Sequence, residues 1–274
     1  VCISSMIRRP PRSTLFPYPT LFRSLDKGAA DAVTTSMEEA VKDADIVVSA
    51  VPVEAMESVF TEMAPFLKPD AVVTDVGSTR QTVIAAARKG LGDKFHQYAP
   101  AHPIAGGEMP GVDYASADLF DEKVVISTPD EGMDPKVVVF MEDAWRKAGA
   151  RVQTMSPHQH DLTFASVSHL PHVLAYALVD MIAREENAQE KLKMAGAGFR
   201  DFTRIASSSP VMWRDICLSN REALSHELKR YRTSLDTLQK YIDESDGKAL
   251  ESVFENAVKN RRGLVFPEIG RAHV

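Results

Sequence analysis

Several features are scarce in this sequence of 274 residues, and each scarcity excludes a class of protein. Its two cysteines, Cys2 and Cys217, cannot form a disulfide framework or a metal-ligand cluster, so we expect a protein of the reducing cytoplasm. No apolar run approaches the roughly 18 uninterrupted residues that a membrane-spanning helix needs, so we expect a soluble protein without a membrane partner. The net charge of −6 argues against a nucleic-acid partner, whose phosphates require a basic surface.

The residues that are present favour folded domains with unusual ends. A hydrophobic share of 44% with 26% charged residues excludes disorder as the default, and the length suits two modest domains. Because residues 1–25 contribute +4 and residues 265–274 contribute zero to the net charge, residues 26–264 carry −10. Pro17 and Pro19 interrupt both the apolar stretch of a signal peptide and the amphipathic helix of a transit peptide.

Both ends resemble foreign sequence. Residues 8–24 resemble translated sequencing-adapter sequence, and residues 268–274 resemble the same kind of segment. We therefore predict foreign tails over residues 1–25 and 265–274, the first of them disordered, and exclude both from the fold.

Strand and helix signals alternate from residue 26 to about residue 155. The continuous β-branched runs at 45–52 and 71–76 are typical of strands buried on both faces of a parallel sheet. Helices are predicted over 36–43, 54–67, 78–89 and 134–149, with Asp134 and Pro135 as N-cap and first residue of the last. Further strands are predicted over 95–101, 123–127 and 151–154. This alternation predicts a doubly wound, Rossmann-like α/β domain over residues 26–155.

The strand signals stop beyond Pro157, and residues 156–264 are helical in pattern, which predicts a second, all-α domain. Within it, six apolar residues are spaced alternately four and three apart: Leu224, Leu228, Tyr231, Leu235, Leu238 and Ile242. This spacing predicts a narrow seam of the coiled-coil type. The seam fits an intrachain helix pair and a dimer interface equally well.

Three predicted strand ends carry the residues where a ligand would bind. In open α/β sheets, ligands bind beyond the carboxyl ends of the strands, where Val51-Pro52, Gly77-Ser78 and His102-Pro103 are placed. A dinucleotide is the natural occupant, so Val51, Pro52 and Gly77 are candidate cofactor contacts. The sequence nevertheless lacks the Gly-x-Gly-x-x-Gly motif that normally follows the first strand.

His102 is the most suggestive of the eight histidines. It follows a strand and lies beside small residues, and an imidazole can accept a hydroxyl proton near neutral pH. A structural role remains the alternative. His158 and His160, two residues apart, cannot share one helix face and are expected in the interdomain turn.

Two other groups also have a functional and a structural interpretation. His169 and His172 share a helix face as a metal pair would, but no third ligand is signalled, so polar packing is favoured and no metal site is predicted. The guanidinium of Arg204 suits a substrate carboxylate, or equally an ion pair with Asp201.

Six segments together resemble the prephenate/arogenate (cyclohexadienyl) dehydrogenase family, and they occur in the family's order over about residues 26–262. They are Asp45-Ile-Val-Val-Ser-Ala-Val-Pro52, Thr74-Asp-Val-Gly-Ser-Thr-Arg80, His102-Pro-Ile-Ala-Gly-Gly-Glu108, Ser168-His-Leu-Pro-His172, Gly198-Phe-Arg-Asp-Phe-Thr-Arg204 and Met212-Trp-Arg-Asp-Ile216. The resemblance implies a Rossmann-like domain followed by a helical dimerisation domain, and hence a homodimer.

The resemblance also implies a reaction and its residues. The family oxidises prephenate with NAD+, or in some members NADP+ or arogenate, and releases CO2 to form 4-hydroxyphenylpyruvate in tyrosine biosynthesis. By position, His102 matches the catalytic histidine, and Ser78 matches the serine that assists it. Arg204 matches the arginine that binds a substrate carboxylate, and His172 matches a substrate-side histidine. Trp213 falls in a segment near the family's subunit interface.

One departure from the family qualifies these expectations. Family members begin with a strand, a glycine-rich turn, a helix and a second strand ahead of the segment that starts at Asp26, and the adapter-like tail stands in their place. We therefore expect the chain as written to bind NAD+ poorly. Two alternatives are a non-catalytic dimerising helical module on a degenerate nucleotide fold, and another NAD(P)-dependent hydroxyacid dehydrogenase.

Overall fold

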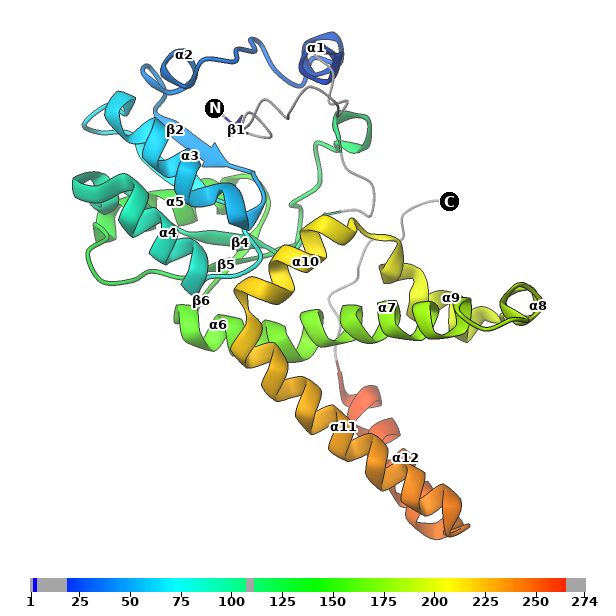
Figure 1. The fold of residues 1–274 in the computed structure, drawn as a ribbon. Coiled ribbons are helices and arrows are strands. Elements are labelled where there is room, and N and C mark those ends of the chain that lie inside the picture. Colours follow the sequence, from blue (N-terminus) through cyan, green and yellow to red (C-terminus); the bar gives the residue numbers. More distant parts are fainter. Residues whose placement is uncertain (1, 4–18, 107–110, 265–274) are drawn as a thin grey trace. The chain divides into compact units, whose positions relative to one another are not determined.

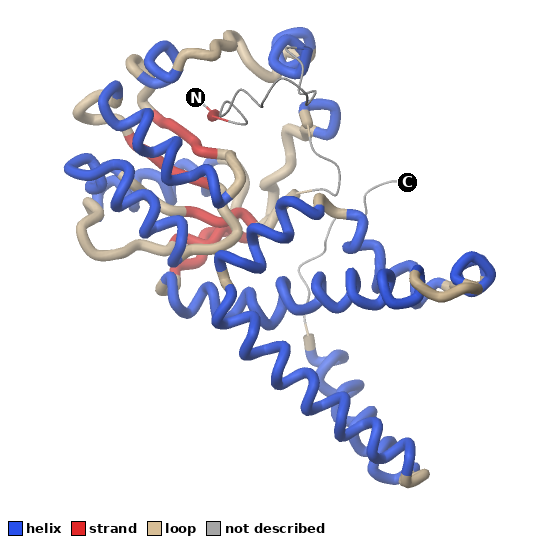
Figure 2. The backbone as a smooth tube through the Cα atoms, viewed as in Figure 1, coloured by secondary structure: helices blue, strands red, loops and turns tan. Residues whose placement is uncertain are grey.

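The structure, a computed structural model, describes residues 2–3, 19–106 and 111–264 (Figures 1 and 2). The predicted C-terminal tail and most of the N-terminal one lie outside these residues. Two parts of the N-terminal segment are regular, contrary to the prediction of disorder: β1 (Cys2–Ile3) and α1 (Pro19–Asp26). β1 pairs in parallel with β2, because the free edge of that strand offers unpaired backbone donors and acceptors.

The first sheet contains the two buried strands that the β-branched runs predict. β2 (Ile46–Ser49) and β3 (Val72–Asp75) pair in parallel, with Ile46 opposite Val72, in the order β1-β2-β3. Helices α2 (Met37–Val41), α3 (Met56–Met63) and α4 (Gln81–Leu91) belong to this part of the fold, and short 3₁₀ turns (Val53–Ala55 and Ala64–Phe66) flank α3. The carboxyl ends of β2 and β3 therefore lie at one edge, as predicted.

The second sheet differs from the doubly wound arrangement that we predicted. β4 (Ala101–Pro103) runs antiparallel to β5 (Val124–Ser127), and β6 (Arg151–Thr154) pairs in parallel with β5. Of the strand predicted over 95–101, residues 95–97 belong to a 3₁₀ helix (Gly92–Gln97), Tyr98 forms a single parallel bridge with Val73, and β4 begins only at Ala101. The predicted N-cap of α5 (Pro135–Lys147) is confirmed, since the Asp134 side chain accepts a hydrogen bond from the Lys136 N–H.

The core of this α/β part is one continuous apolar cluster. Its fully buried side chains include Met56, Phe60, Val73 and Tyr98. Helices α3 and α4 approach so closely at Gly90 that a Cβ atom there would lie 2.6 Å from the Cβ of Phe60. Close helix packing thus fixes α4, the helix that follows the Gly77-Ser78 strand end.

A helical segment follows β6 and packs in the same compact unit, which spans residues 1–224. It contains α6 (Pro157–Phe164), a π-helical turn (Ala165–His169), α7 (Leu170–Ala183), α8 (Ala188–Lys193), α9 (Ala197–Thr203), a 3₁₀ turn (Arg204–Ser207) and α10 (Pro210–Ser219). The run from Pro157 to Ala183 is long and apolar enough to cross a membrane by length and composition alone. Within it, the polar side chains of His160, Asp161 and His169 are buried and hydrogen-bond to other elements, and 28% of the apolar window is buried.

A second compact unit spans residues 225–274. It contains α11 (Arg221–Asp243) from Ser225 onward and the whole of α12 (Gly247–Gly263). The predicted seam lies on α11, and its side chains Tyr231, Leu235 and Ile242 are exposed, as are Phe254 and Val258 of α12. Leu224 is buried and Leu228 and Leu238 are half-buried, so part of the seam is available to a partner among the described residues.

Candidate active site

The Gly77-Ser78 turn directly follows β3 and leads into α4. The Gly77 N–H donates to Oδ1 of Asp75 over 2.8 Å. A Cβ atom on Gly77 would lie 3.0 Å from that same oxygen and 3.1 Å from the Arg80 guanidinium, so glycine suits this position. Ser78 is half-buried and lies ahead of Arg80, the N-cap of α4 (Gln81–Leu91). At the end of β2, Val51 is buried and Pro52 is exposed, so the candidate cofactor contacts do lie at neighbouring strand ends.

His102 occupies the middle of β4 and is half-buried. Its Nδ1 lies 2.8 Å from Nε2 of His160, a residue 58 positions later in the chain. The ring of Phe164 packs against His102 at a centroid distance of 5.0 Å. The structure thus attaches the candidate catalytic histidine to α6.

The structure corrects the prediction that His158 and His160 lie in an interdomain turn. Both His158 and His160 lie in α6, which begins at Pro157 with Ser156 as its N-cap, but His158 is exposed whereas His160 is fully buried. The Ser156-Pro157 pair is the N-cap and first-residue signature of a helix, so the sequence did contain the signal that places His160 inside one.

Asp161 anchors His160. Its Oδ1 lies 2.9 Å from Nδ1 of His160 and accepts the backbone N–H of Arg80 over 2.7 Å. Its Oδ2 accepts both the backbone N–H and the side-chain amide of Gln81 over 3.0 and 3.2 Å. The carboxylate therefore accepts the backbone N–H groups of Arg80, the N-cap of α4, and of Gln81, its first residue, at the helix end where the dipole favours negative charge. We call His102, His160 and Asp161 the relay.

The hydrogen-bond partners fix the proton positions along the relay. An ionised carboxylate only accepts, so Nδ1 of His160 must carry the proton and its Nε2 must accept. His102 then donates from Nδ1 to that Nε2, and its own Nε2 is left without a proton. The relay therefore makes Nε2 of His102 an acceptor, as a general base requires.

The electrostatics keep both imidazoles neutral. Burial lowers the pKa of His102 well below its ordinary value, and the charges of His160, Arg80 and His169 lower it further. Burial also lowers the pKa of His160, despite its bond to Asp161. Burial alone would raise the pKa of Asp161, but the hydrogen bonds from His160, Arg80 and Gln81 outweigh it and hold that pKa below its usual value.

The second group of predicted residues lies around α7. His172 donates from Nδ1 to the carbonyl oxygen of Ser168 over 2.9 Å, and its ring stacks on Trp213 at 3.6 Å between centroids. Burial lowers the pKa of His172, and the charge of Arg204 contributes in the same direction. Arg204 itself is exposed at the start of a 3₁₀ turn.

The described residues contain no group of three metal-ligating side chains. His169 instead accepts a hydrogen bond at Nδ1 from Nδ2 of Asn220 over 3.1 Å, and that same amide donates to the backbone carbonyl of Asp161. Burial lowers the pKa of His169 to about 4. Polar packing, the favoured interpretation, matches this geometry.

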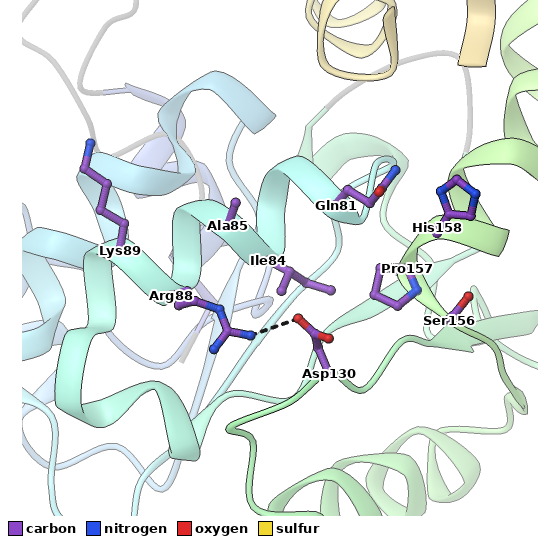
Figure 3. Close-up of a pocket in the computed structure, with 9 residues that line it drawn as sticks. All are labelled: Gln81, Ile84, Ala85, Arg88, Lys89, Asp130, Ser156, Pro157 and His158. Atoms are coloured by element: carbon purple, nitrogen blue, oxygen red, sulfur yellow. Dashed lines mark hydrogen bonds and ion pairs between the residues drawn. The ribbon is translucent and has the colours of Figure 1, made fainter. Parts of the chain in front are cut away.

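A surface hollow of about 560 Å³ lies beside α4 (Figure 3). It is lined by residues of α4, of the loop after β5 and of the start of α6, including Gln81, Arg88, Asp130 and His158. Its Arg88 pairs with Asp130 over 2.9 Å, as the dashed line shows. The predicted site residues do not line it.

Comparisons with known proteins agree over most of the chain. The family model described as prephenate dehydrogenase, nucleotide-binding domain, matches residues 20–154, and the model described as prephenate dehydrogenase, dimerization domain, matches residues 156–256. Cyclohexadienyl dehydrogenase of Zymomonas mobilis is 38% identical over 244 residues, which cover 88% of this chain and 82% of the relative. Prephenate dehydrogenase of Bacillus subtilis is 34% identical over 249 residues, which cover 90% of this chain and 67% of the relative.

A solved structure shows the same relationship. The crystal structure of prephenate dehydrogenase from A. aeolicus in complex with hydroxyphenyl propionate and NAD+ superposes with a TM-score of 0.81. It is 35% identical in sequence, and the match covers 88% of this chain and 85% of that one.

Proposed function

The chain belongs to the prephenate dehydrogenase family, and on this premise we propose that it oxidises prephenate with NAD+ to 4-hydroxyphenylpyruvate and CO2. The parallel ends of β2 and β3, with Val51, Pro52 and Gly77, fit a dinucleotide by their position at one sheet edge. NAD+, when bound there, supplies the acceptor for the hydride that leaves C4 of the substrate ring.

His102 is the general base of this proposal. Its unprotonated Nε2 accepts the proton of the C4 hydroxyl as hydride leaves C4, while the bond from the ring to its carboxylate breaks to release CO2 and the ring becomes aromatic. The observation that carries this assignment is the relay, because the bonds from Asp161 through His160 leave Nε2 of His102 as the free acceptor. Ser78, at the turn after β3, assists at the nicotinamide side.

Arg204 and His172 are the proposed substrate-binding pair. Prephenate carries two carboxylates, and the planar guanidinium of Arg204 can bind one of them through two parallel hydrogen bonds. The His172 ring is fixed by Ser168 and Trp213, so its Nε2 can face a polar group of the substrate without loss of side-chain entropy.

A homodimer in the cytoplasm completes the proposal. The matched dimerization domain carries apolar side chains that are exposed in the single chain, among them Val167, Met181, Val211 and Leu218. Such a concentration of exposed apolar residues is typical of a surface that a partner covers.

Initial-rate measurements test the proposal. Prephenate-dependent NADH formation is followed by absorbance with the chain as given and with a chimera that carries the first βαβ unit of a relative ahead of Asp26; arogenate and NADP+ are run in parallel. We expect turnover in the chimera and its near loss in His102→Asn. The control, His96→Asn, replaces an exposed histidine that lies outside the relay and should retain turnover.

Binding measurements separate chemistry from folding. Calorimetry with 4-hydroxyphenylpyruvate should give the same affinity for the His102→Asn variant and the parent chain. No turnover with either prephenate or arogenate in a chimera that binds NAD+ would contradict the proposal, and would favour a non-catalytic helical module.

A further inference from the structure

Arg80 is the largest completely buried side chain among the described residues. A buried guanidinium is uncommon, because removing its charge from water is costly unless every donor is paired. Its partners therefore show what its burial achieves.

The guanidinium of Arg80 connects two strand ends. Nη2 and Nη1 donate to Oδ1 and Oδ2 of Asp75, at the end of β3, over 2.6 and 3.2 Å. Nη1 also donates to the carbonyl oxygen of Ala101 over 2.8 Å. Ala101 directly precedes His102 in β4, and Asp75 holds the N–H of Gly77. One side chain thus spans from the Ser78 turn to the strand of the proposed base.

The backbone of Arg80 adds a third connection. Its N–H donates to Oδ1 of Asp161, the anchor of the relay. The buried hydroxyl of Tyr98 donates to Asp75 as well, so this carboxylate is fully engaged. Arg80 lies beside Gly77, a proposed cofactor contact, and it contacts each element that carries the relay or the Ser78 turn.

We propose that Arg80 is a positioning residue for the reaction: its fork holds the Ser78 turn and the His102 strand in one arrangement while its N–H holds Asp161. This inference rests on the proposed function for its effect on turnover. The planar fork is essential, because a lysine ammonium could pair with Asp75 but could not span Asp75 and Ala101 with the same geometry.

The charges around His102 give the inference a second measurable consequence. The groups that face this imidazole are His160 and Asp161 from α6, His169 from the π-helical turn, and Arg80 ahead of α4. Burial is the main cause of the lowered His102 pKa, and the positive charge of Arg80 adds to it. Removal of that charge should therefore raise the pKa of His102.

Three variants test the inference. Arg80→Lys keeps the charge without the fork, and Arg80→Met removes both. Asp75→Asn/Arg80→Met also removes the opposing carboxylate, so that no unpaired buried charge prevents folding. The matched control is Arg88→Met, which breaks the exposed Arg88–Asp130 pair further along the same helix (Figure 3).

Two readouts distinguish positioning from a merely structural role. The first is kcat and KM for prephenate in the chimera, normalised to the sites that bind 4-hydroxyphenylpyruvate. The second is the His102 pKa, measured by NMR of ¹³C-labelled histidine in the full chain and assigned with His102→Asn. It needs no turnover, so it shows whether Arg80 acts on His102 even where a chimera without activity rejects the proposed function.

We expect Arg80→Met and the double variant to lose at least about ten-fold in kcat per binding site, with KM within about two-fold and a raised His102 pKa. Arg80→Lys should keep the parent His102 pKa and lose about three- to ten-fold in kcat. Arg88→Met should match the parent in both readouts. If the folded double variant keeps the parent kcat per site and the parent His102 pKa, Arg80 has only a structural role and the inference is wrong.

Discussion

Replacement of Asp161 by asparagine tests the relay at its charged end. The carboxylate accepts four hydrogen bonds, two at Oδ1 and two at Oδ2. In Asp161→Asn, one of these positions becomes an NH2 group that faces two donors. If the NH2 takes the Oδ2 position, the N–H of Gln81 loses its acceptor. If it takes the Oδ1 position, the N–H of Arg80 loses its acceptor and His160 must carry its proton on Nε2. His160 then donates to His102, which leaves His102 with its proton on Nε2 and no basic nitrogen.

The magnitudes follow from these bonds. A hydrogen bond to a charged group contributes about 1.5–3 kcal/mol, a neutral one about 1 kcal/mol, and an unpaired buried donor costs about 1–3 kcal/mol. We expect Asp161→Asn to lower the free energy of unfolding by about 3 kcal/mol at pH 7. General-base catalysis contributes roughly 10²–10⁴-fold, and only one of the two amide orientations abolishes the base. With the NH2 group at the Oδ1 position in about 90–99% of the molecules, kcat falls about 10- to 100-fold, or about 1.4–2.7 kcal/mol, with little change in KM.

The assay pairs urea unfolding with initial rates in the chimera. Asp180→Asn is the control, because Asp180 lies on the same helical run but forms only an exposed pair with Arg184. It should change stability by less than about 0.5 kcal/mol and leave kcat unchanged. If Asp161→Asn unfolds at lower urea yet keeps kcat within about two-fold of the parent, Asp161 supports the fold only, and the proton positions assigned to the relay are wrong.

Three further predictions concern other parts of the chain. Arg204→Gln should raise KM for prephenate about 10- to 100-fold with a smaller effect on kcat, and an unchanged KM in initial-rate assays would remove Arg204 from the site. Gly90→Ala should destabilise the fold by about 1–3 kcal/mol because its Cβ has no room beside Phe60, whereas Gly247→Ala, with open space, should stay within about 1 kcal/mol in urea unfolding. The pKa of His169 is about 4 in the folded state, below its pKa in the unfolded chain. Its contribution to folding stability is therefore complete above about pH 6.5 and is lost as the pH falls towards 4. That loss is about 3 kcal/mol, and His169→Gln should flatten the pH dependence of unfolding over this range.

The sequence predicts local structure well where the signal is local. The β-branched residues Ile46-Val-Val48 of β2 and Val72-Val-Thr74 of β3 are typical of strands in a parallel sheet that is covered by helices. Asp134-Pro135 fixes the start of α5 because capping involves neighbours in the chain. His102 also stands out, since it follows a predicted strand and lies beside small residues.

The support around His102 could not be predicted in the same way. His160 lies 58 residues from His102, and its contact depends on how α6 packs against β4, which no spacing encodes. The burial of Arg80 contradicts the general preference of arginine for the surface and follows only from the meeting of Asp75 and Ala101. The antiparallel β4 was missed because two of its three residues flank a histidine in a run too short to show periodicity.

The unprotonated state of His102 and the loss of folding stability in acid have the same physical cause. Burial lowers the pKa of His102, His160 and His169, which keeps all three imidazoles neutral and lets each donate from one nitrogen and accept at the other. The same three groups bind protons on unfolding as the pH falls below about 6.5, so each one favours the unfolded chain under acid conditions. A protonated His160 could no longer accept from His102, and the relay would break before the chain unfolds. Turnover should therefore decline at a higher pH than the loss of tertiary structure, a separation that parallel pH series of kcat and tryptophan fluorescence can measure.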